Sequence, residues 1–131
     1  MSQLSVHPTL DTAWWWQALR QGELLVPACR SCKRRFFPPQ AFCPHCGSQD
    51  WYGAGTSGAG RIYSWVVNHR ALSAEFADEV PYAIVAVAME EGGRLIGRYA
   101  GPLDALRDAL PVRATMLRQG EETVLGFEPA V

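Results

Sequence analysis

The chain carries two stretches that decide its fold, Cys29-Arg30-Ser31-Cys32 and Cys43-Pro44-His45-Cys46. Together they form the pattern C-x2-C-x10-C-x2-C and contain all four cysteines of the chain. Each C-x-x-C stretch makes a tight turn that presents two sulfurs to one point, so four thiolates can converge on a single ion. The expected metal ligands are Cys29, Cys32, Cys43 and Cys46. The expected ion is one structural zinc, because four protein ligands leave no open position for water.

Other interpretations of the cysteines stay open. Two disulfides could use the same residues, although the expected cytosolic setting favours reduced thiols. Redox chemistry at one C-x-x-C fits a twinned arrangement poorly, whereas iron can occupy the same four-sulfur site.

His45 lies inside the second turn and is expected to face solvent. Lys33 and Gly47 follow the second cysteine of each pair, where such a turn needs a backbone conformation that glycine adopts without strain.

Length and composition limit the classes of protein. The chain has 131 residues, which corresponds to about one domain and excludes a fusion of two enzymes or a large barrel. With 48% hydrophobic and 19% charged residues, the composition is that of a globular protein rather than a disordered one. No apolar run approaches the roughly 20 residues that cross a bilayer, and the N-terminus lacks the pattern of a secretion signal. We therefore expect a soluble, cytoplasmic protein with no membrane partner.

Charge is balanced overall but concentrated in one place. Twelve Lys and Arg oppose thirteen Asp and Glu, a formal net charge of -1, so the chain as a whole does not attract a polyanion. Positive residues crowd the first cysteine pair, and no acid lies between Glu23 and Asp50. These cations are Arg30, Lys33, Arg34 and Arg35. Any function that depends on positive charge is therefore expected at this local cluster.

Three parts are predicted along the chain: an N-terminal arm and helix (1–28), a zinc ribbon (29–52) and a barrel (53–131). The helix is expected from Asp11 or Thr12 to Gln21, with a capping side chain at its start and Gly22 as its stop. Residues 23–28 are expected to be extended and to lead into the ribbon.

The third part has the pattern of a small barrel. Its predicted strands are 61–69, 82–89, 94–100, 112–118 and 123–128. A short helix is expected over 102–110, where leucines recur at helical spacing. Five strands with one helix between the third and fourth is the order of an OB barrel, and an SH3-like barrel is the competing prediction. Residues 53–60 are glycine-rich and predict a hinge or tight connection into the sheet, since they lack the spacing of a phosphate-binding loop. The fold class is therefore mainly β.

Three consecutive tryptophans, Trp14, Trp15 and Trp16, lie in the predicted helix. Successive helical residues are about 100° apart, so the three indoles spread over about 200° and one face cannot bury them all. We expect them to dock a partner, because indoles are favoured interface anchors. The alternative is that the ribbon and the barrel clasp the helix from two sides.

These motifs also carry a family resemblance. The run from Trp15 to Leu25, the two C-x-x-C stretches, Phe37-Pro38-Pro39, the run from Gly60 to Trp65 and Pro81-Tyr82 resemble the family labelled domain of unknown function thirty-five. The resemblance extends from the first helix to the last strand. Two positions depart from the family pattern: Lys33 stands where glycine is frequent, and Trp14 extends the usual aromatic pair.

The resemblance implies both a fold and a role. The implied fold is an N-terminal helix, a rubredoxin-like zinc ribbon and an OB barrel. The implied role is that of a small non-catalytic partner of a thiolase-like or lipid-transfer-protein-like enzyme in acyl-CoA and lipid metabolism. The implied partners are a thiolase, a hydroxymethylglutaryl-CoA synthase, a steroid side-chain aldolase or an acyltransferase, in a hetero-oligomer.

The leading hypothesis is therefore an accessory subunit that binds such an enzyme and supports the binding or channelling of acyl-CoA. Arg30, Lys33, Arg34 and Arg35 could contact the phosphates of coenzyme A, to which arginine is suited, or could simply be solvated.

Two hypotheses from other classes remain. Zinc ribbons and OB barrels also bind single-stranded nucleic acid. Residues 61–131, however, carry seven arginines against ten acids, which would repel a phosphate chain. An autonomous enzyme is the weakest hypothesis, since every thiol is assigned to metal and His69 is the one candidate acid or base.

Overall fold

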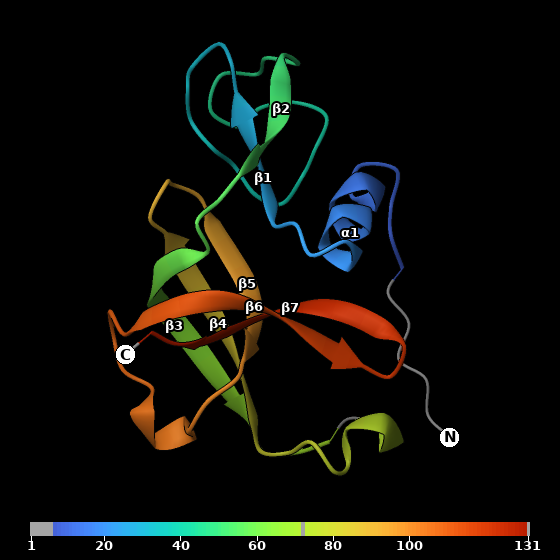
Figure 1. Ribbon diagram of the computed structural model, residues 1–131, viewed down its shortest axis with the longest axis vertical. Helices are drawn as coiled ribbons and strands as arrows, with labels where there is room; N and C mark the ends of the chain where they lie inside the picture. The colour runs from blue at the N-terminus through green and yellow to red at the C-terminus, as the bar shows by residue number, and fades with distance from the viewer. Residues whose placement is uncertain (1–6, 72, 131) are drawn as a thin grey trace.

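The computed structural model describes residues 7–71 and 73–130, and it places the two-stranded ribbon above a small barrel, with one helix beside the ribbon (Figure 1). The elements before the barrel are α1 (Ala13–Arg20), β1 (Leu25–Cys29) and β2 (Trp51–Gly55). The barrel strands are β3 (Ala59–Asn68), β4 (Tyr82–Met89), β5 (Arg94–Tyr99), β6 (Pro111–Gln119) and β7 (Glu122–Pro129). Two single 3-10 turns, η1 (Ala74–Phe76) and η2 (Leu103–Ala105), lie in the barrel loops. The predicted mainly β fold class is confirmed.

Helix α1 ends as its sequence predicts but begins differently. Gly22 has φ +83, and the N–H of Glu23 donates to the carbonyl of Ala18 at 2.9 Å, so the glycine closes the helix in a left-handed conformation. At the start, Thr12 caps no helical N–H group with its side chain. Its hydroxyl instead accepts a bond from the backbone N–H of Thr9, so the predicted side-chain cap is wrong.

The ribbon sheet joins the two ends of the cysteine-containing segment. β1 pairs antiparallel with β2 in the register from Leu25↔Gly55 to Cys29↔Trp51. The glycine-rich segment 53–60 is therefore a connector only over 56–58, because β2 includes Gly55 and β3 begins at Ala59. The predicted boundaries at 28/29 and 52/53 fall inside β1 and β2, and as domain limits they stay a prediction.

The five barrel strands close in the order β3-β4-β5-β7-β6. All pairs are antiparallel except β5 with β7, which meet in parallel at Arg98↔Gly126 and Tyr99↔Phe127. Glycines permit this closure: a Cβ atom on Gly97 would lie 2.9 Å from both the Leu125 carbonyl oxygen and the Phe127 ring. The five-strand order agrees with the OB prediction rather than with the SH3-like alternative.

The predicted helix over 102–110 is wrong. Only the single turn η2 forms there, and Ala109 adopts φ +62, which is incompatible with a right-handed helix. The N–H of Ala109 donates to the Ile62 carbonyl at 3.0 Å, so the segment bonds to β3 rather than to itself. Leu103 and Leu106 still pack on the core, so their spacing reflects burial from a loop.

Two separate cores hold the molecule. The larger core combines the inward side chains of the barrel with residues of α1 and β1, including Trp15, Leu19 and Val26. The smaller one lies in the ribbon and consists of Cys29, Phe36 and Cys43, with Cys32 and Trp51 packed against it. The helix and the first strand are therefore continuous with the barrel core, while the cysteine turns are not. Among the residues described, no helix has the length and apolar character needed to span a membrane.

Candidate functional site

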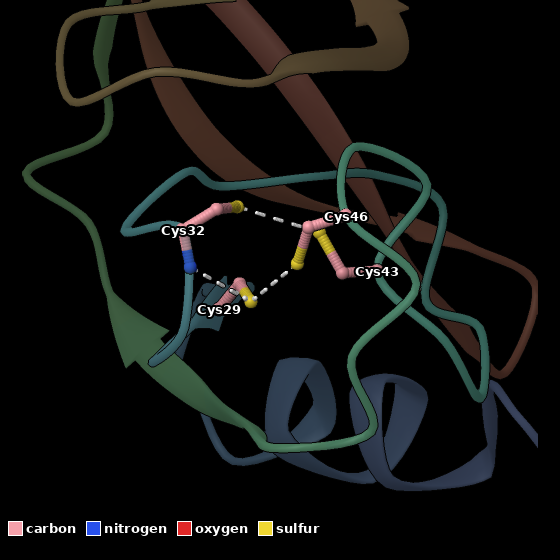
Figure 2. A group of neighbouring side chains, drawn as sticks. All are labelled: Cys29, Cys32, Cys43 and Cys46. Atoms are coloured by element: carbon pink, nitrogen blue, oxygen red, sulfur yellow. Dashed lines mark hydrogen bonds between the residues drawn. The ribbon is translucent and has the colours of Figure 1, made fainter.

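The four cysteine side chains point toward one common centre (Figure 2). Their sulfurs all lie within 4.8 Å of one another, with Cys29 Sγ 3.6 Å from Cys46 Sγ and Cys32 Sγ 3.7 Å from Cys43 Sγ. A tetrahedral zinc with bonds of about 2.3 Å requires sulfurs about 3.8 Å apart. The thiols therefore have the spacing of a four-sulfur zinc site and are too far apart for disulfides, which need about 2.05 Å.

Both cysteine turns have the same backbone geometry. The N–H of Lys33 donates to the Cys29 carbonyl at 3.0 Å, and the N–H of Gly47 donates to the Cys43 carbonyl at 2.8 Å. Lys33 and Gly47 have φ +66 and +79, so the conformation predicted for these two positions is confirmed. Lys33 adopts it against the preference of a residue with a Cβ atom, which indicates that the turn is imposed by the position of the sulfurs.

Backbone N–H groups within the turns also point at the sulfurs. The N–H of Cys32 donates to Cys29 Sγ at 3.5 Å, which stabilises the thiolate and lowers the pKa of Cys29 to about 6. The N–H of Ser48 favours the Cys46 thiolate in the same way, but burial and the neighbouring thiols outweigh it and raise the pKa of Cys46 to about 11. Protons therefore compete with a metal ion for these sulfurs.

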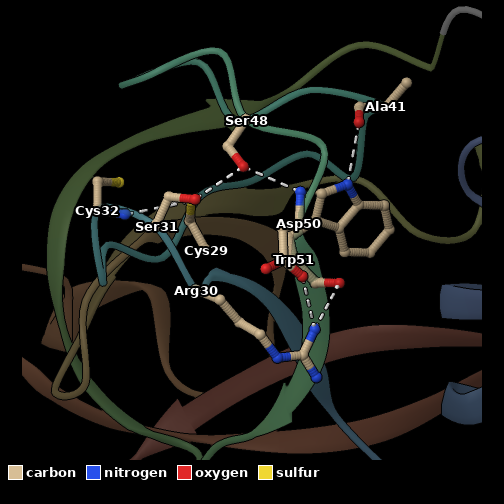
Figure 3. Close-up of polar contacts among 8 residues, drawn as sticks. All are labelled: Cys29, Arg30, Ser31, Cys32, Ala41, Ser48, Asp50 and Trp51. Atoms are coloured by element: carbon tan, nitrogen blue, oxygen red, sulfur yellow. Dashed lines mark hydrogen bonds and ion pairs between the residues drawn. The ribbon is translucent and has the colours of Figure 1, made fainter.

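Polar contacts outside the sulfur cluster join the first cysteine turn to the second (Figure 3). The hydroxyl of Ser31 donates to Ser48 Oγ at 2.9 Å, and Ser48 Oγ accepts the N–H of Asp50 at 3.0 Å. Arg30 pairs with the Asp50 carboxylate at 3.2 Å. His45 is exposed, as expected, and lies beside the cluster rather than in it.

The four predicted cations do not all face the same space. Arg30, Lys33 and Arg35 line one cavity of about 480 Å³, whereas Arg34 is exposed and is not part of its wall. Glu91 lines the same cavity. Hydrogen bonds from the Ser57 N–H and the Thr56 hydroxyl lower the pKa of Glu91 to about 2, so this wall is anionic at neutral pH. Phosphate contact by the four cations stays a prediction.

The tryptophans are clasped as the alternative prediction describes. Trp15 is 5% exposed, with its ring centroid 5.4 Å from that of Phe37, and Trp16 meets it edge-on at 4.8 Å. Trp14 lies on the ribbon side, where its ring centroid is 5.7 Å from that of Trp51. Trp14 and Trp16 are half-buried, so neither indole projects freely into solvent. Docking of a partner by these three residues stays a prediction.

The structure also contains an apolar groove that sequence reasoning missed. It has a volume of about 330 Å³ and lies between α1, the Phe37 loop and the barrel. Trp15, Trp16, Phe37 and Ile96 are among the residues that line it. The signal in the sequence was the uninterrupted apolar run Tyr82–Met89, since a strand with one solvated face should alternate with polar residues.

Comparison with known proteins places this architecture in a family. One family model, "ChsH2, rubredoxin-like zinc ribbon domain", matches residues 16–51, and another, "ChsH2, C-terminal OB-fold domain", matches residues 56–117. A chain of the solved structure "Ltp2-ChsH2(DUF35) aldolase" is 35% identical, with a TM-score of 0.86 over 97% of this chain and 100% of that one. This chain belongs to the ChsH2/DUF35 family. The resemblance predicted from the sequence motifs is thereby confirmed.

The curated relatives of this chain include longer proteins. A "Probable enoyl-CoA hydratase alpha subunit" of Thermomonospora curvata is 37% identical over 123 residues, which are 92% of this chain but 38% of that protein. A "DUF35 domain-containing scaffold protein" of Methanocaldococcus jannaschii is 29% identical over 85 residues, 63% of this chain and 60% of that protein. This DUF35 chain thus spans less than two thirds of either relative.

Proposed function

We propose that this chain is a non-catalytic subunit that binds a thiolase-like enzyme and supports acyl-CoA binding or channelling within the complex. The observation that carries the proposal is the match over the whole of the ChsH2(DUF35) chain of an Ltp2 aldolase structure. The relatives named as a hydratase alpha subunit and as a scaffold protein support the same role. The predicted division into arm and helix, ribbon and barrel is retained as the domain organisation.

The proposed role of the metal centre is structural. A zinc ion would be held by Cys29, Cys32, Cys43 and Cys46, whose spacing suits it, and it would supply folding free energy to the ribbon. Four sulfurs complete a tetrahedral shell, which supports a structural site rather than a catalytic one. The ordered ribbon would then support α1 on one side, through Trp14 and Trp51, while the barrel core holds its other side.

Co-expression with an Ltp2-type aldolase tests the docking. We expect the two proteins to co-elute in size-exclusion chromatography at a fixed ratio, and mass spectrometry of the peak to identify both. Trp16→Ala should weaken the complex by about thirtyfold or more, since interface indoles commonly contribute about 2 kcal/mol or more. Leu10→Ala, at an exposed apolar residue outside the groove, is the matched control. Separate elution of the wild-type proteins at micromolar concentration would contradict the proposal.

Contacts among the described residues weigh against the nucleic-acid alternative. Open aromatic faces are needed to stack bases, but the Arg94 guanidinium lies over the Tyr63 ring at 4.1 Å and that of Arg98 over the Tyr82 ring at 4.9 Å. Retention of a single-stranded oligonucleotide at near-physiological salt would be the result that restores it.

A further inference from the structure

A further cleft lies between the ribbon and the barrel, and Arg35 lines both this cleft and the cavity beside Arg30. The cleft has a volume of about 540 Å³, and its wall includes Arg35 and His45 from the ribbon and Arg94 from β5. None of the residues that line it is an acid. This distinguishes it from the cavity beside Arg30, where Glu91 forms part of the wall.

The two arginines of this cleft remain available for an anion. Within the described part of the chain, neither Arg35 nor Arg94 pairs with a carboxylate. The Arg94 guanidinium lies over the Tyr63 ring at 4.1 Å, a contact of its flat face that leaves the N–H groups at its edge to donate. Arg35 donates one hydrogen bond, to the Gly55 carbonyl at 3.1 Å, and its guanidinium has further N–H groups to offer. The Gly92-Gly93 turn packs against the Cβ atom of Arg35: a Cβ atom added to Gly93 would lie 3.8 Å from it. The barrel therefore positions the base of the Arg35 side chain.

The basic cleft adjoins the apolar groove at one shared residue. Phe37 lines both, and β5 crosses from one to the other, because Arg94 lines the cleft while Ile96 lines the groove. These two β5 residues lie on the same outward face, with their Cα atoms about 7 Å apart. The cleft also has apolar walls, including Pro44 and Met89. The arginines thus lie in the cleft, the indoles of Trp15 and Trp16 lie in the groove, and Phe37 lines both.

We infer that the cleft and the groove form one binding site for a molecule with a phosphate-bearing head and an apolar tail. Arg35 and Arg94 bind the phosphates, and Trp15, Trp16 and Ile96 cover the tail. The choice of a coenzyme A thioester as this molecule rests on the proposed function. Arg94, which the sequence alone did not indicate, thus contacts phosphate in this site, and Arg34 lies outside it.

Isothermal titration of the zinc-loaded full chain, alone and in complex with an Ltp2-type aldolase, tests this site with three probes: octanoyl-CoA, coenzyme A and octanoate. We expect octanoyl-CoA to bind most tightly, because it alone supplies both head and tail. Arg94→Gln should weaken octanoyl-CoA and coenzyme A alike by about tenfold, the scale of one charged hydrogen bond, and leave octanoate unaffected.

A second variant separates the tail from the head. Ile96 is 63% exposed, so Ile96→Ser leaves the fold intact but removes apolar surface from the groove. We expect octanoyl-CoA to bind about fivefold more weakly to this variant and coenzyme A to bind as before. Val66→Ser, at a residue 60% exposed on β3, and Arg113→Gln, at an exposed arginine on β6, are matched controls that lie outside both walls.

Three outcomes would overturn the site. Equal losses in Arg94→Gln and Arg113→Gln would show attraction by charge alone. Unchanged binding of octanoyl-CoA to both test variants, in the chain and in the complex, would place the ligand elsewhere. An absence of binding to the chain and to an intact complex would exclude the site while leaving the proposed docking function in place. Loss of co-elution, by contrast, would contradict the proposed function itself.

Discussion

The ribbon and the barrel achieve order by different physical means. The buried cluster of the ribbon is small, comprising Cys29, Phe36 and Cys43, and a two-stranded sheet of this size is marginal in water. The barrel closes five strands around a core that also takes in Trp15 and Leu19 of α1. Metal coordination must therefore stabilise the first region, whereas burial of apolar surface stabilises the second.

The largest predicted effect comes from breaking the metal site. Cys43→Ser, or removal of the ion by a chelator, should unfold the ribbon, because structural zinc contributes about 10–16 kcal/mol in small zinc-binding domains. The barrel should keep its strands, since its core does not include the cysteines. Elemental analysis measures the zinc content, and hydrogen exchange resolved by segment measures the order of the ribbon and of the barrel separately. His45→Ala, in the same turn, should keep one zinc per chain. Loss of barrel protection together with the ribbon would contradict this independence.

The reverse experiment weakens the barrel. Leu95 is 0% exposed, so Leu95→Ala should lower the free energy of unfolding by about 3 kcal/mol. Ile96→Ala, one residue along the same strand on its outer face, should change it by less than about 0.5 kcal/mol. Urea unfolding followed by circular dichroism gives both values, and zinc content should stay at one per chain in each variant. Equal destabilisation by the two substitutions would contradict the assigned inward and outward faces.

Acidification should separate the two regions without a mutation. The Cys29 thiol has a pKa of about 6 and that of Cys46 a pKa of about 11. Protons therefore displace zinc increasingly as the pH falls, and affinity should drop about tenfold per pH unit for each proton that the metal must displace. Competition with a zinc-sensitive dye between pH 8 and pH 6 measures this slope. A flat profile would indicate that the thiols are already ionised without metal.

The smallest predicted effect concerns the connection between the regions. The Glu91 carboxylate accepts bonds from Thr56 and Ser57 in the segment that links β2 to β3. Glu91→Gln should cost about 1 kcal/mol or less, because the group is exposed. The folded pKa of about 2 is below the ordinary 4.5, so this stabilisation is present above pH 4.5 and fades as the pH falls toward 2. Parallel urea titrations of both proteins at pH 7 and pH 3 give the difference in free energy of unfolding, which should shrink on acidification.

Local patterns predicted much of this molecule and failed where contacts are distant. The stop at Gly22 and the turns at Lys33 and Gly47 were predictable, because each depends on a few neighbouring residues. The helix expected over 102–110 was not, since its leucines are spaced by the barrel core that they cover. The hydrogen bonds from Thr56 and Ser57 to Glu91 were equally hidden, because the partners are separated by 35 and 34 positions in the sequence.

The spacing of the cysteines determined that four sulfurs meet, and alternating apolar residues determined that strands follow, because both depend on chain geometry over a few residues. Only the folded structure decided that Arg35 and Arg94 share a cleft and that Phe37 lines both this cleft and the groove beside Trp15 and Trp16. The register of β5 and the packing of the ribbon on the barrel bring these side chains together. Such contacts arise from burying two surfaces against each other, which no short segment encodes.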